Sequence, residues 1–105
     1  MVGPIIAIES SCDETAVAII DAQGQVLANV ISSQDEVHAQ FGGVVPEIAA
    51  REHLTKISRL TQQALKDAKM SSSALATVAA TYGPGLIGPL MIGLQFAKGF
   101  AQALE

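Results

Sequence analysis

The sequence predicts a single α/β domain with the element order β-β-β-α-β-α, and three observations support this fold class. Short runs rich in Ile, Val and Ala open the chain and are typical of buried strands. A longer stretch then repeats apolar residues every three or four positions, as amphipathic helices do. A last apolar run ends at a glycine-rich turn, after which a second helix-like stretch follows.

The opening strands are expected at residues 4–9, 15–21 and 25–32, because each segment is short, apolar and β-branched. Residues 22–24 form the turn between the second and third strands, where Gly24 supplies a positive φ. A polar loop is expected from residue 33 to residue 45.

The first helix is expected over residues 46–69, since Pro46 suits a first helical turn. Glu47 and Arg51 are four residues apart and should pair on its solvent face. Its apolar positions share helical spacing: Ile48, Ala49, Leu54, Ile57, Leu60, Ala64, Leu65 and Ala68. Residues 75–82 form the next predicted strand, which should run parallel to the first strand because a helix joins them.

Composition narrows the class of protein. The 105 residues suffice for one domain with one core, and half of them are hydrophobic, which argues against disorder. The net charge is −4 and the six basic residues are scattered, so the chain lacks a basic stripe that could grip nucleic acid unaided. One cysteine excludes an internal disulfide and fits a reducing compartment.

We expect a cytoplasmic protein that does not enter a membrane. The N-terminus has no basic segment before its apolar run and is therefore a poor signal peptide. The longest apolar stretch, residues 84–97, is too short and too interrupted by Gly and Pro to span a bilayer.

The connection between the first two strands concentrates polar chemistry. It contains Ser10, Ser11, Cys12, Asp13 and Glu14. Backbone N–H groups and hydroxyls in such a turn can hold phosphate oxygens, and the carboxylates can hold a hard cation. The alternative interpretation is an ordinary polar turn exposed to solvent.

The turn after the fourth strand is rich in glycine. Gly83, Gly85 and Gly88 match the dinucleotide-binding pattern G-x-G-x-x-G, and the following helix would offer free N–H groups to a ligand. The preceding three-stranded meander and the stiff Pro84 disfavour a dinucleotide site. A tight turn that binds no ligand is the other alternative.

The last helix carries a stripe of small residues, Gly93, Ala97 and Ala101, at four-residue spacing. Such a stripe lets another backbone approach closely. From the residues alone, ordinary core packing is favoured over a surface that binds a partner.

Three segments together resemble one family. Residues 8–21 (IESSCDETAVAIID), 41–53 (FGGVVPEIAAREH) and 82–101 (YGPGLIGPLMIGLQFAKGFA) are similar, in order and spacing, to the opening of the TsaD/Gcp family. Its members are tRNA adenosine threonylcarbamoyltransferases, formerly called O-sialoglycoprotein endopeptidases or glycoproteases. The chain departs from the common pattern at Ser10, Tyr82 and Pro89, which leaves the expected fold intact.

The resemblance implies an actin/Hsp70-like ATPase fold with two RNase H-like lobes around a nucleotide cleft. Residues 1–105 would be the incomplete N-terminal part of the first lobe, with the second lobe absent. The implied reaction transfers threonylcarbamoyl from its adenylate to N6 of the adenosine next to the anticodon of a tRNA. The fragment alone is expected to be inactive.

The resemblance also implies roles for residues of the two turns. Asp13 and Glu14 are the candidates for catalytic or metal-linked carboxylates. The residues expected close to the substrate are Ser10, Ser11, Cys12, Gly83, Pro84 and Gly85.

Family members bind iron or zinc through a His-x-x-x-His pair and a later Asp. His38 and His53 are fifteen residues apart and do not match that pair, so no metal ligand is expected in this chain. The resemblance further implies a paralogous partner subunit that packs against the two helices, including the small-residue stripe. We also expect the isolated fragment to self-associate.

Two other functions compete with the enzyme. One is a non-catalytic paralogue that acts as a dimerisation or scaffold subunit. The other is a hydrolase that uses Cys12 with His38 or His53, although a loop position for His38 and a helix position for His53 place neither beside the thiol.

Overall fold

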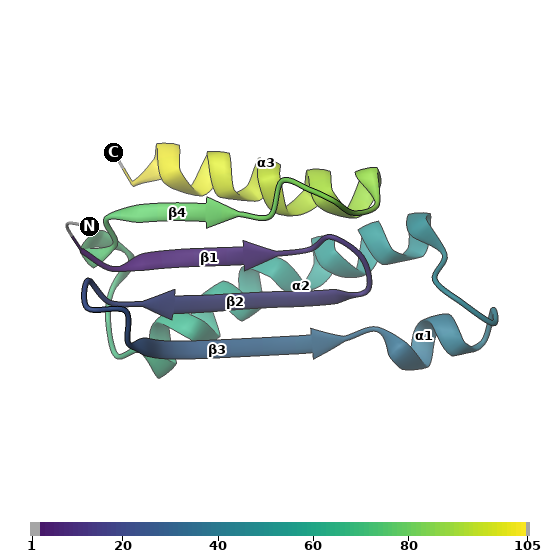
Figure 1. The fold of residues 1–105 in the computed structure, drawn as a ribbon, viewed down its shortest axis with the longest axis horizontal. Coiled ribbons are helices and arrows are strands. Elements are labelled where there is room, and N and C mark those ends of the chain that lie inside the picture. The colour runs from purple at the N-terminus through teal and green to yellow at the C-terminus, as the bar shows by residue number, and fades with distance from the viewer. Residues whose placement is uncertain (1–2, 105) are drawn as a thin grey trace.

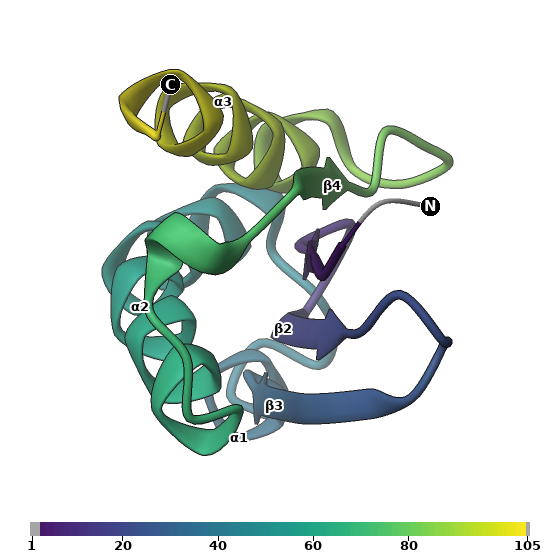
Figure 2. The ribbon, with the colours of Figure 1, turned by 90° about the vertical axis from the view of Figure 1, so that its left-hand side faces the viewer.

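The computed structural model describes residues 3–104 as a four-stranded sheet with two long helices on one face (Figures 1 and 2). Helix α2 packs against β2 and β3, and helix α3 packs against β1 and β4. The elements in chain order are β1 (Ile5–Glu9), β2 (Glu14–Ile20), β3 (Val26–Ser33), α1 (Asp35–Ala39), α2 (Pro46–Asp67), the 3₁₀ turn η1 (Ser72–Ala74), β4 (Thr77–Ala80) and α3 (Ile87–Ala103).

The strand order in the sheet is β3-β2-β1-β4. Strands β1, β2 and β3 pair antiparallel, and β4 pairs parallel with β1. The predicted α/β class, the order of the elements and the parallel fourth strand are therefore confirmed. The parallel pairing has a simple cause, because α2 carries the chain back across the sheet before β4 begins.

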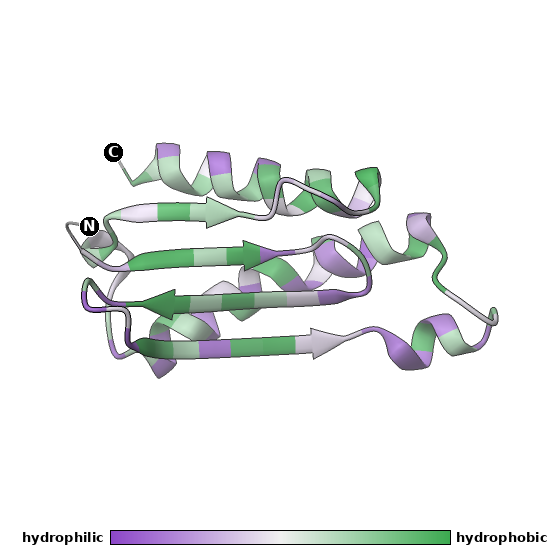
Figure 3. Ribbon diagram, viewed as in Figure 1, coloured by the Kyte–Doolittle hydropathy of each residue, from purple (hydrophilic) through white to green (hydrophobic). Residues whose placement is uncertain are grey.

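Alternation along the central strands determines which face is buried. Ile6 and Ile8 of β1, with Val17 and Ile19 of β2, point to the helices and are at most 2% exposed. Apolar residues dominate both strands, and hydrophilic residues gather where β1 passes into β2 (Figure 3). The fold thus buries the middle of the sheet and leaves its polar corner at one end.

Several predicted boundaries shift for local reasons. Strand β4 is shorter than residues 75–82 because η1 precedes it and the Leu75 N–H donates to Ser72 O at 3.1 Å. Helix α2 ends at Asp67 because Lys69 adopts φ 56° and the Met70 N–H donates back to Leu65 O. This is the Schellman pattern that closes a helix.

Two local predictions are confirmed. Gly24 has φ 84°, as its turn requires. The Glu47 and Arg51 side chains form an exposed ion pair of 2.9 Å. The predicted loop over residues 33–45 was wrong in part, because it contains helix α1.

None of the helices within residues 3–104 combines the length and the hydrophobicity needed to cross a membrane.

Candidate functional site

The two turns singled out in the sequence meet at one end of the sheet. The Leu86 N–H donates to the Ser11 carbonyl oxygen at 2.8 Å. A Cβ added to Gly85 would lie 2.7 Å from both the Ser11 Cβ and the Ser11 oxygen. Gly85 is therefore required for the close approach of the acidic turn (residues 10–14) and the glycine turn (residues 83–85).

Three successive carbonyl groups of the acidic turn are each held by a different part of the chain. The Ser11 oxygen accepts from Leu86 N, at the start of α3. The Cys12 oxygen lies 2.9 Å from Nε2 of His53 in α2. The Asp13 oxygen accepts from Gln34 N at 3.0 Å, just before α1.

This arrangement orients the backbone amides of the turn. A trans peptide is planar, so the N–H of one residue points opposite to the carbonyl of the residue before it. The Cys12 and Asp13 N–H groups therefore point away from Leu86 and His53. Within residues 3–104 neither N–H has a hydrogen-bond partner. Adjacent free amides of this kind suit a negatively charged ligand.

Ser10 fastens the end of β1 to helix α3. Its hydroxyl donates to the Pro89 carbonyl at 2.8 Å and accepts from the Gly93 N–H at 3.0 Å. These are the two groups that one i→i−4 bond of the helix would join. Ser10 is only 1% exposed, so its side chain positions the turn and does not face a ligand.

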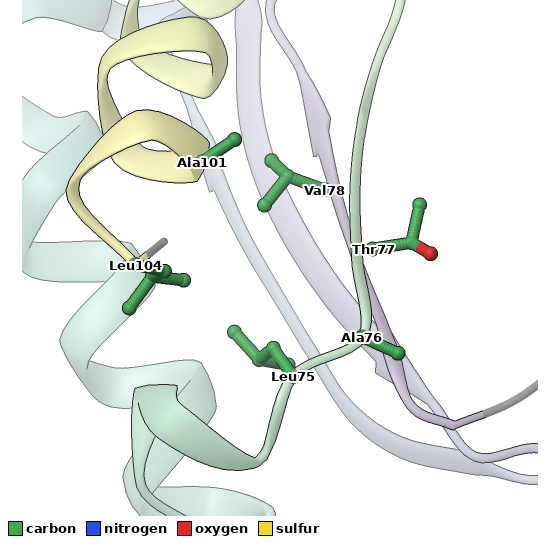
Figure 4. A pocket seen from close by; sticks show the side chains of 6 residues that line it. All are labelled: Leu75, Ala76, Thr77, Val78, Ala101 and Leu104. Atoms are coloured by element: carbon green, nitrogen blue, oxygen red, sulfur yellow. The ribbon is translucent and has the colours of Figure 1, made fainter.

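Two residues of the small-residue stripe of α3, Gly93 and Ala97, pack inside this chain, whereas Ala101 is exposed. Gly93 is buried against Ser10 and Ile8, and Ala97 belongs to the hydrophobic core. Ala101 lines a hollow of about 280 Å³, where its side chain faces Val78 (Figure 4). The predicted contact of Gly93 and Ala97 with a partner subunit was therefore wrong, because the sheet and β1 already cover them.

That hollow is not a candidate for the chemistry. Its lining contains no acid, base or thiol, and it lies at the N-terminal end of β4, whereas the glycine turn follows the C-terminal end. A larger hollow of about 640 Å³ lies beside the glycine turn and includes Tyr82, Pro84 and Gly85. Asp13 and Glu14 do not line it.

His53 is the residue whose role the sequence reasoning missed. It is 0% exposed, and the Thr15 hydroxyl lies 2.7 Å from its Nδ1. A carbonyl oxygen only accepts, so Nε2 carries the proton donated to Cys12 and Nδ1 accepts from Thr15. Burial lowers the pKa of His53 below its usual value, more than the hydrogen bond to the Cys12 carbonyl and the nearby acidic charges raise it.

A signal for His53 did exist in the sequence. Position 53 follows Ala49 and precedes Ile57 at four-residue spacing, on the buried face of α2. A histidine on such a face needs polar partners within the fold. The sequence alone did not place His53 beside Cys12, and the structure brings its ring to the Cys12 backbone carbonyl.

His38 is also buried, in α1 and not in a loop. Its Nε2 donates to Gln34 Oε1 at 2.6 Å, and its Nδ1 accepts from the Val45 N–H at 3.2 Å. Both ring nitrogens of both histidines are thus occupied. Within residues 3–104, no three His, Cys, Asp or Glu side chains are grouped so that they could hold a metal ion.

The thiol of Cys12 is poorly suited to nucleophilic catalysis. Burial, followed by the negative charges of Asp13 and Glu9, raises the pKa of the thiol above its usual value. Neither histidine has a free nitrogen to accept its proton. The geometry therefore gives no support to a cysteine hydrolase.

The acidic side chains of the turn differ in their surroundings. The Glu9 carboxylate accepts from the Ser11 N–H at 2.6 Å and so braces the turn. Asp13 is half-buried and Glu14 is exposed. Within the described range, the ion pairs involve neither of them. Both carboxylates are therefore available to a ligand.

Comparison with known proteins decides the family. A model of the family described as "TsaD: tRNA N6-adenosine threonylcarbamoyltransferase" matches residues 25–105. This chain belongs to the TsaD family. The resemblance seen in the sequence is thereby confirmed.

Curated relatives of this TsaD-family chain carry the same description. The tRNA N6-adenosine threonylcarbamoyltransferase of Clostridium perfringens is 50% identical over 101 residues, which are 96% of this chain and 30% of the relative. The protein of that name from Caldicellulosiruptor saccharolyticus is 54% identical over 99 residues, 94% of this chain and 30% of its own length. The chain thus spans about 30% of the length of these relatives.

Solved structures support the fold. YeaZ from Pseudomonas aeruginosa superposes with a TM-score of 0.73 at 22% identity, covering 97% of this chain and 40% of YeaZ. The predicted α/β class is confirmed at the level of the fold.

Replacing Gly93 by Ala is expected to destabilise the fold by about 1–3 kcal/mol, because the new Cβ would collide with the Ser10 hydroxyl. Gly99 provides a matched control in the same helix. Nothing lies within 4 Å of a Cβ at Gly99, so Gly99→Ala should stabilise by about 0.5–1 kcal/mol. Urea unfolding of both variants measures the difference, and equal effects would contradict the packing described for Ser10.

The lowered pKa of His53 predicts a dependence of stability on pH. Below about pH 6.5 the unfolded chain binds a proton at this histidine that the folded chain does not. The free energy of unfolding therefore decreases as the pH is lowered. The loss levels off once the folded-state histidine is also protonated. Urea unfolding between about pH 7.5 and 5.5 tests this, and His53→Gln should show a weaker dependence. Identical slopes for the two proteins would rule out the assignment.

Proposed function

We propose that this chain is the opening part of an enzyme that transfers a threonylcarbamoyl group from threonylcarbamoyl-adenylate to N6 of the adenosine next to the anticodon of a tRNA. The observation that carries the proposal is the meeting of the two turns. It leaves at one corner of the sheet the Cys12 and Asp13 amides and two carboxylates that form no ion pair within residues 3–104. Relatives at 50% identity or more carry the corresponding description.

The proposed chemistry is an acyl transfer. The N6 amine attacks the carbamoyl carbon of the adenylate, the bond from that carbon to the phosphate oxygen breaks, and AMP leaves. The amine must lose a proton in the process, and a nearby carboxylate such as that of Asp13 or Glu14 can accept it. The free amides of the turn suit the negative phosphate of the adenylate.

The remaining residues of the two turns have supporting roles in this proposal. Ser11 and Cys12 contribute backbone groups, and Ser10 ties the turn to α3. Gly85 lets the turns touch, while Gly83 and Pro84 shape the adjacent loop. The proposed chemistry does not require residues 3–104 to hold a metal ion.

Residues 1–105 alone are proposed to be inactive, with tRNA bound only by a full-length parent in the cytoplasm. The acidic net charge of −4 gives the chain no electrostatic attraction for a polyanion.

The competing function is a non-catalytic scaffold paralogue with the same fold. The unpaired carboxylates favour the enzyme, since a scaffold has no use for them at this corner.

The proposed partner surface lies on the outer sides of α2 and α3. Leu54 is 64% exposed, Ile87 81% and Met91 43%. Leu54 and Met91 line one hollow of about 390 Å³ between the two helices. Apolar side chains gathered across two helices suit a helical pair from a partner subunit, or a second copy of the chain when that subunit is absent.

Asp13→Asn in a full-length parent is expected to lower threonylcarbamoyl transfer to tRNA by about 100-fold or more, because it removes the proposed proton acceptor without changing size. Asp35→Asn, on the exposed first turn of α1, serves as the control and should leave transfer unchanged. Unaltered transfer by Asp13→Asn, or turnover by residues 1–105 alone, would contradict the proposal.

Light scattering should find the isolated chain associated at high concentration and should find Met91→Lys monomeric, because the new charge would be buried on association. Ile31→Lys is a suitable control, since Ile31 is 57% exposed on strand β3, away from the α2–α3 surface. A monomeric parent chain, or equal effects of the two substitutions, would refute the assigned surface.

A further inference from the structure

The middle peptide of the acidic turn depends on a single side chain. The carbonyls of Ser11 and Asp13 are held by backbone N–H groups, which no substitution at the donor residue removes, proline excepted. The Cys12 carbonyl is held by the His53 ring, from a residue 41 positions further along the chain. The orientation of the Cys12–Asp13 peptide is therefore the one that a single side-chain substitution can release.

His53 is itself fixed in one tautomer. Its Nε2 faces a carbonyl oxygen and must carry the proton, and its Nδ1 faces the Thr15 hydroxyl, which donates to it. Thr15 and His53 are both 0% exposed. The imidazole thus has no open nitrogen with which to touch a substrate. Among residues 3–104, its hydrogen-bond partners are the Cys12 carbonyl of the turn and the Thr15 hydroxyl of β2.

We propose that His53 is a positioning residue that holds the Cys12–Asp13 peptide in one orientation, with the Asp13 N–H directed away from α2 and open to an anionic group of the substrate. The same bond limits the directions that the Asp13 carboxylate can take, because the peptide plane precedes its Cα. The orientation follows from this structure alone, whereas its value for catalysis rests on the proposed function.

His53 differs from His38, although both histidines are buried in helices. His38 also uses both ring nitrogens, but its partners are Gln34 and Val45, outside the acidic turn. Loss of His38 should therefore loosen the segment around α1, whereas loss of His53 should release the turn.

Nuclear magnetic resonance of the isotopically labelled 105-residue chain tests the proposal. In the unmutated chain, ring ¹⁵N signals should report a protonated Nε2 and an unprotonated Nδ1 for His53, with a scalar coupling from Nε2 to the Cys12 carbonyl carbon. The Asp13 amide should give one sharp signal.

Three variants then distinguish positioning from simple core packing. His53→Gln places an amide N–H near the original Nε2 position, within reach of Cys12, while His53→Asn is shorter and reaches only toward Thr15. His53→Leu fills the space without any donor. We expect the Asp13 amide signal to broaden or double in the Leu and Asn variants and to be a single sharp signal in the Gln variant. The signals of β1 and β4 should be unchanged in all three variants.

A wild-type-like Asp13 amide in the folded Leu or Asn variant would overturn the proposal, as would an Nδ1-protonated His53 in the unmutated chain. If these variants fail to fold, the tautomer and the coupling to Cys12 in the unmutated chain decide. The test does not depend on activity. Intact transfer by Asp13→Asn in a full-length parent would contradict the proposed function, but it would not affect the assigned orientation of the Cys12–Asp13 peptide.

Discussion

The structure of this corner depends on the hydrogen bonds that hold three successive carbonyls of the acidic turn. They come from the start of α3, from the middle of α2 and from the residue before α1. Each bond fixes one planar peptide, so together they determine where the intervening N–H groups point. A turn of polar residues would otherwise sample many conformations, and ordering its backbone costs about 1–2 kcal/mol per residue in conformational entropy. Here the surrounding elements supply that order.

The rest of the fold brings these donors to the same place. The parallel pairing of β4 with β1 puts the end of β4 next to the end of β1, so the glycine turn arrives beside the acidic turn. Two glycines then allow contact at short range: Gly85 against Ser11, and Gly93 against the Ser10 hydroxyl. The buried stripe of α2 aims His53 at the same corner. The same contacts that pack the core therefore also determine the geometry of the site.

The sequence was sufficient to predict the four strands, the two long helices and their order, but not the contacts among them. Strands rich in Ile and Val, and a helix with regular apolar spacing, carry local signals that survive without tertiary information. The spacing of α2 indicates that His53 is buried, but its partners could not be predicted from the sequence, because they depend on the position of α2 along the sheet. The small residue at position 93 was recognised correctly as a site of close approach, yet the approaching group proved to be Ser10 of the same chain. Short elements such as α1 also escaped prediction, since five residues carry too little periodicity.

Residual dipolar couplings of the Cys12, Asp13 and Glu14 amides test the central claim most directly, because they report the direction of each N–H relative to the sheet. With the alignment tensor taken from β1, β2 and β4, all three couplings should fit the orientations set by bonds from Leu86, His53 and Gln34. Couplings averaged toward zero, or a Cys12–Asp13 peptide rotated by about half a turn, would contradict the account.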